Sequence, residues 1–286
     1  MTIVEAPYIS AQAYVCRLLA KASFEALPSL LLKRPEIIDT IPLARVFVPY
    51  LPGSNLRDTI TATRGITDFG RSAVPHLPAR AFKSKRELSS WLSEIRDTGT
   101  NQLLLIAGDS PIPRGPFTNT LDIIETGLVE FYRFKTVYVA GHPEGHPIVD
   151  QATLLDALAK KRAWSNSTGM GLRLVTQFTF DIERFVKWML AIEDVAQDIP
   201  VYLGIAGPAS PVNLAKYALK CGVKLSSRTM LQNSNARKLI SNWTPNDLLA
   251  DLMRLYPIAA PSGIHLFPFG GIQKTGNWIL KNTSIQ

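Results

Sequence analysis

"LRLVTQFTFDIERFVKWMLAIEDVAQDIPVYLGIAG", residues 172–207, places two short apolar runs on either side of an amphipathic segment. The runs 172–178 and 200–207 are largely continuous rather than alternating, which is typical of parallel strands that are buried on both faces. The segment between them begins with acidic residues and spaces Phe185, Met189 and Ile192 along one helical face. This stretch therefore predicts a strand, a helix and a second strand.

The same unit recurs along the chain. Strands are predicted at residues 22–27, 45–50, 72–77, 102–108, 136–141, 172–178, 200–207 and 263–269. Most gaps between them hold one helix-like pattern, and eight such units within about 260 residues are the signature of a (β/α)8 barrel. An open doubly wound sheet is the alternative, but no G-x-G-x-x-G follows the first strand. We therefore predict an α/β protein with one domain, in which residues 1–20 form an N-terminal helical extension and residues 21–270 form the TIM barrel.

Composition limits the class of protein. A chain of 286 residues with 46% hydrophobic residues can bury a large core. It has no apolar run of the roughly 18 residues that a membrane helix needs, and its N-terminus lacks the basic cluster of a secretory signal. Cys16 and Cys221 lie far apart and without the spacing of metal ligands. We expect a cytoplasmic protein with reduced thiols and no membrane partner.

The net charge of +8, from 31 basic and 23 acidic residues, suggests an anionic partner. The basic residues are scattered along the sequence, and neither an RNA-binding aromatic signature nor a zinc finger is present. A small anionic ligand such as a nucleotide cofactor accounts for the charge as well as nucleic acid does. We therefore expect a small-molecule partner and no nucleic acid, and the sequence leaves the oligomeric state open, a homo-oligomer included.

In such a barrel the chemistry lies at the C-terminal ends of the strands, so polar residues at those positions should converge on one mouth. They are Glu25, Tyr50, Asn55, His76, Asp109, the segment from His142 to His146, Gln177 and the loop 204–211. In "VAGHPEGHP" (139–147), two of the chain's four histidines flank a glutamate. A metal site, a surface loop and a cofactor-binding loop would all look like this locally. A catalytic zinc site needs three or four convergent ligands, and the spacing alone leaves His76 and Asp109 open as further ligands.

Seven segments resemble the methylenetetrahydrofolate reductase family, in the same order and at barrel spacing. "SFEALP" (23–28) is similar to that family's S-F-E-F-F-P, "PHLPAR" (75–80) to P-H-L-T-x-R, and "AGDSP" (107–111) to R-G-D-x-P. "GHPEGHP" (141–147) resembles Y-P-E-x-H-P, "LVTQFTFD" (174–181) resembles I-T-Q-F-F-F-D, and "GIAGPAS" with "GIHLFPF" resembles the seventh and eighth strands. The resemblance implies reduction of 5,10-methylenetetrahydrofolate to 5-methyltetrahydrofolate by NADH or NADPH, usually through FAD, or the reverse reaction.

The resemblance also implies roles for residues on the substrate side. Glu25 is expected to donate a proton to N10 of the folate, and burial is expected to raise its pKa toward neutrality. Asp109 is expected between flavin and folate, where its charge would stabilise a cationic iminium, although a turn cap is the alternative. Gln177 is expected to pair with the pterin edge, because an amide offers both a donor and an acceptor.

On the cofactor side the resemblance implies that His146 helps to bind the flavin. His142 stands where the family has a tyrosine that lies against the flavin, and His76 and Asp109 are also expected to contact the cofactor. Lys161 approximately matches a lysine near the flavin phosphates, although a lysine at a helix end is the simpler interpretation. The loop after the fifth strand is thus expected to hold a cofactor rather than a metal.

Four positions depart from the family pattern. Pro49 replaces a threonine near flavin N5, Ala107 replaces an arginine, His142 replaces the tyrosine, and "HLFPFGG" lacks the arginine that follows the eighth strand. Two alternatives therefore remain open. One is direct hydride transfer from the nicotinamide to the folate without flavin, and the other is a folate-binding barrel that has lost catalysis.

Overall fold

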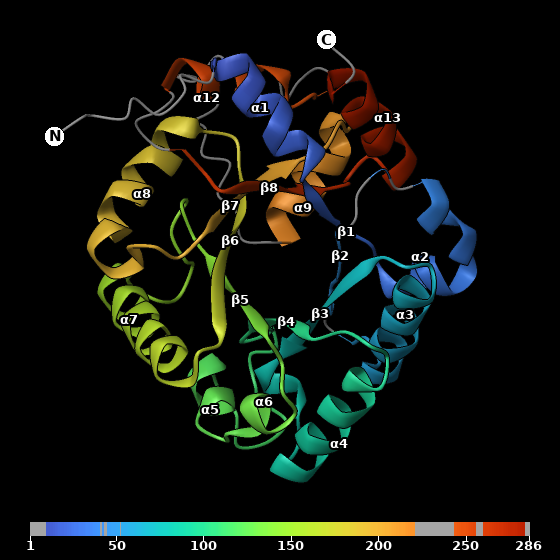
Figure 1. Ribbon diagram of the computed structural model, residues 1–286, viewed down its shortest axis with the longest axis vertical. Coiled ribbons are helices and arrows are strands. Elements are labelled where there is room, and N and C mark those ends of the chain that lie inside the picture. The colour runs from blue at the N-terminus through green and yellow to red at the C-terminus, as the bar shows by residue number, and fades with distance from the viewer. Residues whose placement is uncertain are drawn as a thin grey trace, which may run out of the picture.

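Eight parallel strands close into a barrel in which each strand pairs with the next and β8 pairs with β1 (Figure 1). The computed structural model describes residues 10–40, 42, 45–51, 53–220, 243–255 and 260–283. The strands are β1 (Ser23–Glu25), β2 (Arg45–Val48), β3 (Ser72–Pro78), β4 (Gln102–Ile106), β5 (Thr136–Gly141), β6 (Gly171–Thr179), β7 (Val201–Ala206) and β8 (Gly263–Phe267). Every predicted strand overlaps an observed one, and the (β/α)8 prediction is confirmed.

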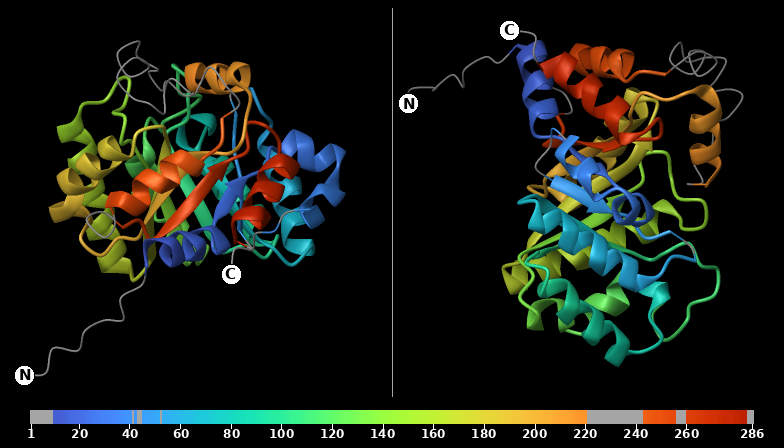
Figure 2. Two further views of the ribbon diagram at one scale, coloured as in Figure 1. Left: turned by 90° about the horizontal axis from the view of Figure 1, so that it is seen from above. Right: turned by 90° about the vertical axis from the view of Figure 1, so that its right-hand side faces the viewer.

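Helices surround the barrel, as Figures 1 and 2 show from three directions. They are α1 (Ala11–Ala20), α2 (Pro28–Lys33), η1 (Pro35–Thr40), α3 (Leu56–Asp68), η2 (Ala79–Ala81), α4 (Lys85–Arg96), α5 (Thr120–Ile124), α6 (Leu128–Phe131), α7 (Gln151–Thr168), α8 (Ile182–Ala196), α9 (Pro211–Lys220), α12 (Asn246–Leu255) and α13 (Ile272–Thr283). Among the described residues, none of these helices is both long enough and apolar enough to cross a membrane.

The unit β6–α8–β7 forms as its sequence predicts. Asp181 begins α8 by accepting a hydrogen bond from the backbone N–H of Arg184 at 3.2 Å, which satisfies a donor at the helix start. The apolar face of α8 buries Phe185 and Ile192 against the barrel. Complete burial of a phenylalanine contributes about 2–3 kcal/mol, so this face is sufficient to hold α8 on the sheet.

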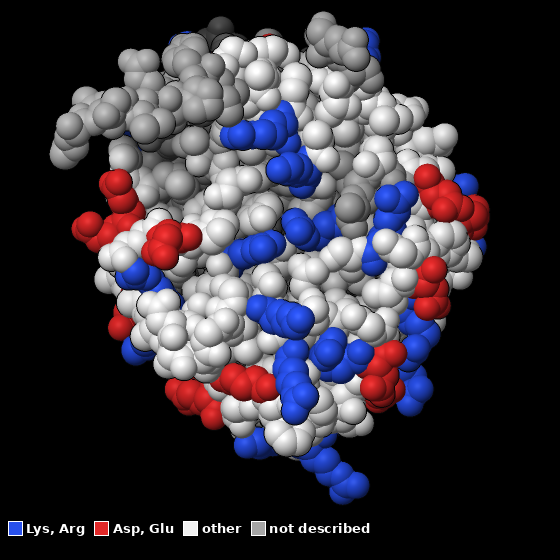
Figure 3. All heavy atoms as spheres, viewed as in Figure 1, with Lys and Arg blue, Asp and Glu red and all other residues white. Residues whose placement is uncertain are grey.

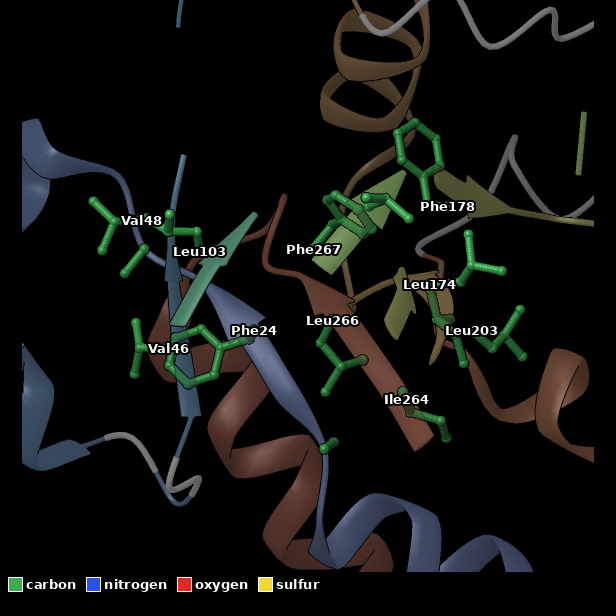
Figure 4. Close-up of a cluster of buried hydrophobic side chains, with 14 of the residues drawn as sticks. Phe24, Val46, Val48, Leu103, Leu174, Phe178, Leu203, Ile264, Leu266 and Phe267 are labelled. Atoms are coloured by element: carbon green, nitrogen blue, oxygen red, sulfur yellow. The ribbon is translucent and has the colours of Figure 1, made fainter. Parts of the chain in front are cut away.

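Alternation along the strands produces two cores. Val46 and Val48 of β2 point outward into the layer between barrel and helices, where Figure 4 shows them with neighbours such as Phe24 and Leu266. Phe47 points the other way and packs inside the barrel in a smaller cluster. The members of this inner cluster are Phe47, Val74, Leu104, Tyr138 and Val175. Because this cluster fills the middle of the barrel, polar groups are confined to its two ends.

The end at which the strands begin is closed by arginine and tyrosine. The guanidinium of Arg45 lies 6.0 Å and 5.9 Å from the ring centroids of Tyr138 and Tyr202. Arg173 donates to the Tyr138 hydroxyl at 3.0 Å. Such stacking of cations on aromatic rings accommodates charge without a carboxylate partner.

Helix α1 crosses this same end, since Tyr14 donates to the carbonyl of Pro261 just before β8. Figure 3 shows this end of the molecule, where lysine and arginine side chains form a band across the middle and acidic side chains lie mostly toward the edge. Part of the net positive charge therefore lies at the end of the barrel opposite the mouth, away from the ends of the strands where chemistry is expected.

Candidate active site

At the mouth, Glu25 stands on the inner apolar cluster between two histidines. It is the last residue of β1, and its Oε1 lies 3.6 Å from Nε2 of His76 in β3 and 3.6 Å from Nε2 of His265 in β8. The Glu25 side chain is 20% exposed, whereas those of His76 and His265 are 8% and 1% exposed. Closure of the barrel places β8 beside β1, which brings together residues 240 positions apart.

Hydrogen bonding orients the His265 ring. Its Nδ1 lies 3.0 Å from the hydroxyl of Ser23, and Ser23 and His265 are direct partners in the β1–β8 pairing. Its Nε2 is buried, has no hydrogen-bond partner among the described residues and faces the Glu25 carboxylate. A carboxylate favours an N–H facing it, so we assign the ring proton to Nε2, with the Ser23 hydroxyl donating to Nδ1.

The histidines decide the charge of Glu25. Burial raises the pKa of the Glu25 carboxyl, but the nearby His265 and His76 rings lower it more, and the net pKa is below its usual value. The expectation that burial would raise this pKa is therefore wrong for the protein without ligand. Burial lowers the pKa of His76 to about 4, so that His76 is neutral at pH 7. Glu25, with its lowered pKa, is then an ionised carboxylate beside the neutral ring of His76.

The loop after β5 begins with a close approach to α8. A side-chain carbon on Gly141 would lie 2.7 Å from the ring of Trp188, so only glycine fits at the end of β5. Gly145 has φ +84° and its N–H donates to the carbonyl of His142 at 3.0 Å, which forms a tight turn. The turn places the rings of His142 and His146 edge to face, with centroids 4.9 Å apart.

Both of these histidines are held in the neutral form. Nδ1 of His146 accepts hydrogen bonds from the backbone N–H groups of Ile148 at 3.2 Å and Val149 at 3.0 Å, so the neutral ring carries its proton on Nε2. Burial and the nearby Arg80 lower the pKa of His146, while Asp109 opposes them. Burial, with help from His146, lowers the pKa of His142 to about 4. The loop thus offers an N–H donor without adding positive charge.

Lys161 is the cation of this region. It lies in the third turn of α7 rather than at the helix end, so the helix-end interpretation is wrong. Burial lowers the pKa of its ammonium to about 8, and its charge contributes to the lowered pKa of His142. Within the described part of the chain Lys161 forms no ion pair. Burying an ammonium without a counter-charge is costly, and an anionic ligand would supply that counter-charge.

Asp109 and Arg80 lie on neighbouring loops. Asp109 is exposed and makes no hydrogen bond with the described residues, so it does not act as the turn cap that was the alternative. Its charge reaches His146, which places the loops after β4 and β5 on the same side of the mouth. Arg80 donates from Nε to Thr118 at 2.7 Å and from Nη1 to Ser110 at 3.2 Å, both through carbonyl oxygens. Arg80 thus supplies a cation beside the loop that lacks an arginine at Ala107.

Gln177 lies at an irregularity of β6. The pairing with β7 shifts register between Val175 and Phe178, and Gln177 accepts a hydrogen bond from the Phe178 N–H at 3.1 Å through Oε1. On the neighbouring strand β7, a side-chain carbon on Gly204 would lie 2.3 Å from the carbonyl oxygen of Thr176. The bulge therefore requires glycine at position 204. The amide nitrogen of Gln177 makes no hydrogen bond with the described residues and is available to a ligand.

The structure therefore forms two groups from the predicted residues. Glu25 and His76 lie together with His265, and His142, His146, Asp109 and Lys161 influence one another electrostatically. His76 was expected to contact the cofactor, whereas in the structure it lies beside the Glu25 carboxylate on the substrate side. No hydrogen bond or ion pair between described residues joins Gln177 to either group, although β1 and β6 end at the same mouth.

Other predicted positions have structural roles or lie apart. Asn55 caps α3 by accepting from the Arg57 N–H at 2.9 Å. Tyr50 is half-buried, and burial raises the pKa of its hydroxyl. Within the described residues no group of three or more histidine, cysteine, aspartate or glutamate side chains could hold a metal ion. Of the loop 204–211, Ala209 forms a bridge to Trp243.

A pocket of about 570 Å³ lies elsewhere, near the starts of β5 and β6. It is lined by Glu130, Phe134, Lys135, Thr168, Gly169 and Met170. None of the candidate residues contributes to it, so we place the site at the strand ends on the chemistry of their side chains.

Three residues of the mouth were not identified from the sequence. Ser23 and His265 lie within the quoted segments, but only the pairing of β1 with β8 shows that they support Glu25. Arg80 ends the segment "PHLPAR", and its spacing gives no sign that it ties down the loop after β4. A signal exists only for His265, because it is one of four histidines and lies in a predicted strand.

Comparison with known proteins agrees with this arrangement. The sequence model of the methylenetetrahydrofolate reductase family matches residues 46–237. The 5,10-methylenetetrahydrofolate reductase of Salmonella typhimurium is 27% identical over 220 residues, which are 73% of this chain and 71% of that enzyme. The enzyme of Escherichia coli that carries the same name is 29% identical over 63% of this chain and 60% of its own length.

Solved structures show the same fold. A protein from Clostridium thermocellum, described as binding two copies of 5-methyl-5,6,7,8-tetrahydrofolic acid, superposes with a TM-score of 0.65 over 96% of this chain and 99% of its own, at 10% identity. At that identity the likeness establishes the barrel alone. The family match covers two thirds of the chain, includes the loops that carry Asp109, His142, His146 and Gln177, and leaves Glu25 and His265 outside its bounds. The chain belongs to the methylenetetrahydrofolate reductase family.

Proposed function

We propose that the protein interconverts 5,10-methylenetetrahydrofolate and 5-methyltetrahydrofolate, with NADH or NADPH as the partner in hydride transfer. The observation that carries this proposal is the carboxylate of Glu25, which lies at the barrel mouth 3.6 Å from Nε2 of each of two histidines in a chain of this family. A barrel that only bound folate would not need a buried carboxylate in this setting, because burying it costs free energy.

In the reductive direction the folate ring must open before hydride adds. Proton transfer to N10 breaks the bond between N10 and the methylene carbon, and leaves an iminium at N5 that accepts hydride at that carbon. We propose Glu25 as the proton donor. Both histidines approach its Oε1, so Oε2 is the oxygen that is free to carry the proton to the folate.

The pKa of Glu25 has to rise for this role, since it is lowered in the protein without ligand. A bound pterin would cover the 20% of the side chain that is exposed and would exclude water from it. Desolvation favours the neutral acid, and the two nearby imidazoles, which lower the pKa of Glu25, would stabilise the carboxylate that remains after proton transfer. The sign of the pKa shift would thus change when the substrate binds.

The remaining substrate-side residues complete the reaction. The negative charge of Asp109 would stabilise the cationic iminium, which develops only as N10 leaves. The unpaired amide nitrogen of Gln177 would donate to the pterin edge while its oxygen remains on the Phe178 N–H. Because the same groups stabilise one transition state from both sides, they serve reduction and oxidation equally.

The cofactor side fits a phosphate-bearing cofactor such as FAD. Lys161 is a partly buried ammonium without a carboxylate partner among the described residues, and His146 carries an Nε2–H donor next to a tight turn. FAD, when bound, would carry hydride between nicotinamide and folate. Pro49 and Ala107 lack groups that the family uses near a flavin, and this favours a second candidate in which hydride passes directly from the nicotinamide. A flavin absorbance spectrum from the purified protein separates the two.

Glu25→Gln tests the proposed reaction. The amide keeps the size of the side chain but cannot donate an acidic proton, so kcat with methylenetetrahydrofolate should fall by about 10²–10⁴-fold while folate still binds. Glu36→Gln, which removes an exposed carboxylate on η1, is the control and should leave kcat unchanged. Unchanged turnover in Glu25→Gln would refute the proton-donor role. Folate binding without turnover by the wild type would instead favour a non-catalytic barrel.

A further inference from the structure

Glu144 lies in the turn between His142 and His146, but its side chain points away from solvent. It is only 12% exposed, although the neighbouring Gly145 and Pro147 are exposed. Its Oε1 accepts a hydrogen bond from the Thr179 hydroxyl at 2.6 Å, and its Oε2 accepts one from Nη1 of Arg184 at 2.9 Å. Both carboxylate oxygens are therefore bound to groups outside the loop.

The two anchors are themselves fixed. Thr179 is fully buried at the end of β6, and its hydroxyl also accepts from the Asp181 N–H at 3.0 Å. Asp181 caps α8, and its Oδ2 lies 3.6 Å from Nε of Arg184. Short hydrogen bonds to an ionised carboxylate are the stronger kind, so Glu144 joins the loop after β5 to the junction between β6 and α8.

This clamp (Glu144 with Thr179 and Arg184) determines how His146 is presented. The turn from His142 to Gly145 and the bonds from Ile148 and Val149 to Nδ1 form only if the loop keeps its path across the end of β5. Beyond it the loop has little support, as Ile148 is 85% exposed. Without the clamp, several loop conformations would compete, and Nδ1 of His146 would lose the two backbone donors that keep the ring proton on Nε2.

We propose that Glu144 is a positioning residue, which holds the loop so that His146 presents Nε2–H to a bound cofactor. This inference rests on the proposed function for the identity of that cofactor, but the positioning itself is a property of the chain. Since Thr179 follows Gln177 by two residues on β6, the same clamp sets the cofactor loop relative to the strand that carries the substrate amide.

The test compares Glu144→Gln with Glu183→Gln in the full-length protein. Glu183 is an exposed carboxylate on the same helix as Arg184 and is a matched control for the loss of one negative charge. The first readout is the pair of ¹⁵N chemical shifts of the His146 ring, which distinguish the tautomers and need no ligand. The second is the dissociation constant of FAD from quenching of flavin fluorescence.

In the wild type and Glu183→Gln, the His146 shifts should report a proton on Nε2. In Glu144→Gln they should move toward the average of two tautomers, and FAD should bind about tenfold more weakly with an unchanged folding transition. If the two residues act through one contact, Glu144→Gln/Arg184→Gln should bind FAD no more weakly than Glu144→Gln. The inference is overturned if Glu144→Gln leaves the His146 shifts of the wild type intact. Failure of the wild type to bind FAD would refute the cofactor assignment alone, because the shifts still decide the role of Glu144.

Discussion

At the scale of single residues, burial and neighbours determine protonation in opposite senses at the two groups of the mouth. The two nearby histidines keep the pKa of Glu25 low in spite of burial, whereas burial lowers the pKa of the Lys161 ammonium to about 8. Each group also contains a histidine, His76 or His142, whose pKa burial lowers to about 4, so that it is neutral at pH 7. Charge at this mouth is therefore set by environment rather than by residue type.

Lys161 should make the binding of an anionic cofactor depend on pH. Its ammonium loses its proton as the pH rises through about 8, so FAD should bind more weakly above that pH, by up to about tenfold per pH unit. Lys161→Arg keeps its proton at these pH values and should give a flat profile. Fluorescence titrations between pH 7 and 9.5 measure this effect. Equal slopes for the two proteins would show that another group controls the dependence.

At the scale of elements, glycines allow strands to approach where side chains must be aimed into the mouth. Gly204 lets β7 pass close to the bulge of β6, where its N–H donates to the hydroxyl oxygen of Thr176 at 2.8 Å. Gly141 likewise admits Trp188 of α8. The bulge re-aims Gln177, and the tight turn after β5 aims His146. Both devices depend on contacts between neighbouring elements.

Gly204→Ala should therefore destabilise the protein and displace Gln177. A methyl group 2.3 Å from the Thr176 carbonyl oxygen forces the backbone to move, at a cost of about 1–3 kcal/mol, and should raise KM for folate more than it lowers kcat. Gly65→Ala is the control, since nothing lies within 4 Å of its added carbon inside α3 and alanine favours helix. Urea unfolding and steady-state kinetics measure both effects. A Gly204→Ala protein as stable as the wild type would contradict the close approach.

At the scale of the whole molecule, buried neutral histidines link the stability of the barrel to pH. The pKa of His76 is about 4 in the folded protein against 6.5 for an ordinary histidine, so below pH 6.5 the unfolded chain binds a proton that the folded chain does not. Stability is then lost as pH falls from about 6.5 to 4, by about 3 kcal/mol at most for this group. The lowered pKa of Glu25 acts in the same sense at still lower pH.

His76→Asn removes this titratable group, so the unfolded chain of the variant no longer takes up this proton as the pH falls. Urea midpoints measured between pH 7 and 4.5 should fall less steeply in His76→Asn than in the wild type, even if the variant is less stable at neutral pH. Lys160→Asn, which changes an exposed cation on α7, should keep the slope of the wild type. Parallel slopes for all three proteins would mean that His76 is protonated in the folded state.

Local sequence patterns were enough to predict the barrel, but they were not enough to predict the pKa values of the residues at its mouth. The runs around Leu174 and Leu203 and the apolar face of α8 predict their elements because strand and helix periodicity are local. The predictions for the pKa of Glu25 and for the place of Lys161 in α7 were wrong. The pKa of Glu25 depends on His265 from the last strand, and the place of Lys161 depends on where the helix ends. The helical extension over residues 1–20 remains a prediction, of which the described part is α1. Cys221 lies outside the described residues.

The amino-acid sequence alone determined the succession of strands and helices, the closure into a barrel and the membership of residues such as Glu25, Asp109 and Gln177 in one mouth. These follow from periodicity and from the rule that parallel strands end together. Only the tertiary structure decided that His76 and His265 flank Glu25, that Glu144 bonds to Thr179 and Arg184, and that Lys161 lacks a carboxylate partner within the described chain. Such contacts join segments that are far apart in the sequence. Their energies depend on distances and burial in the folded protein, and the spacing of residues along the chain does not reveal either.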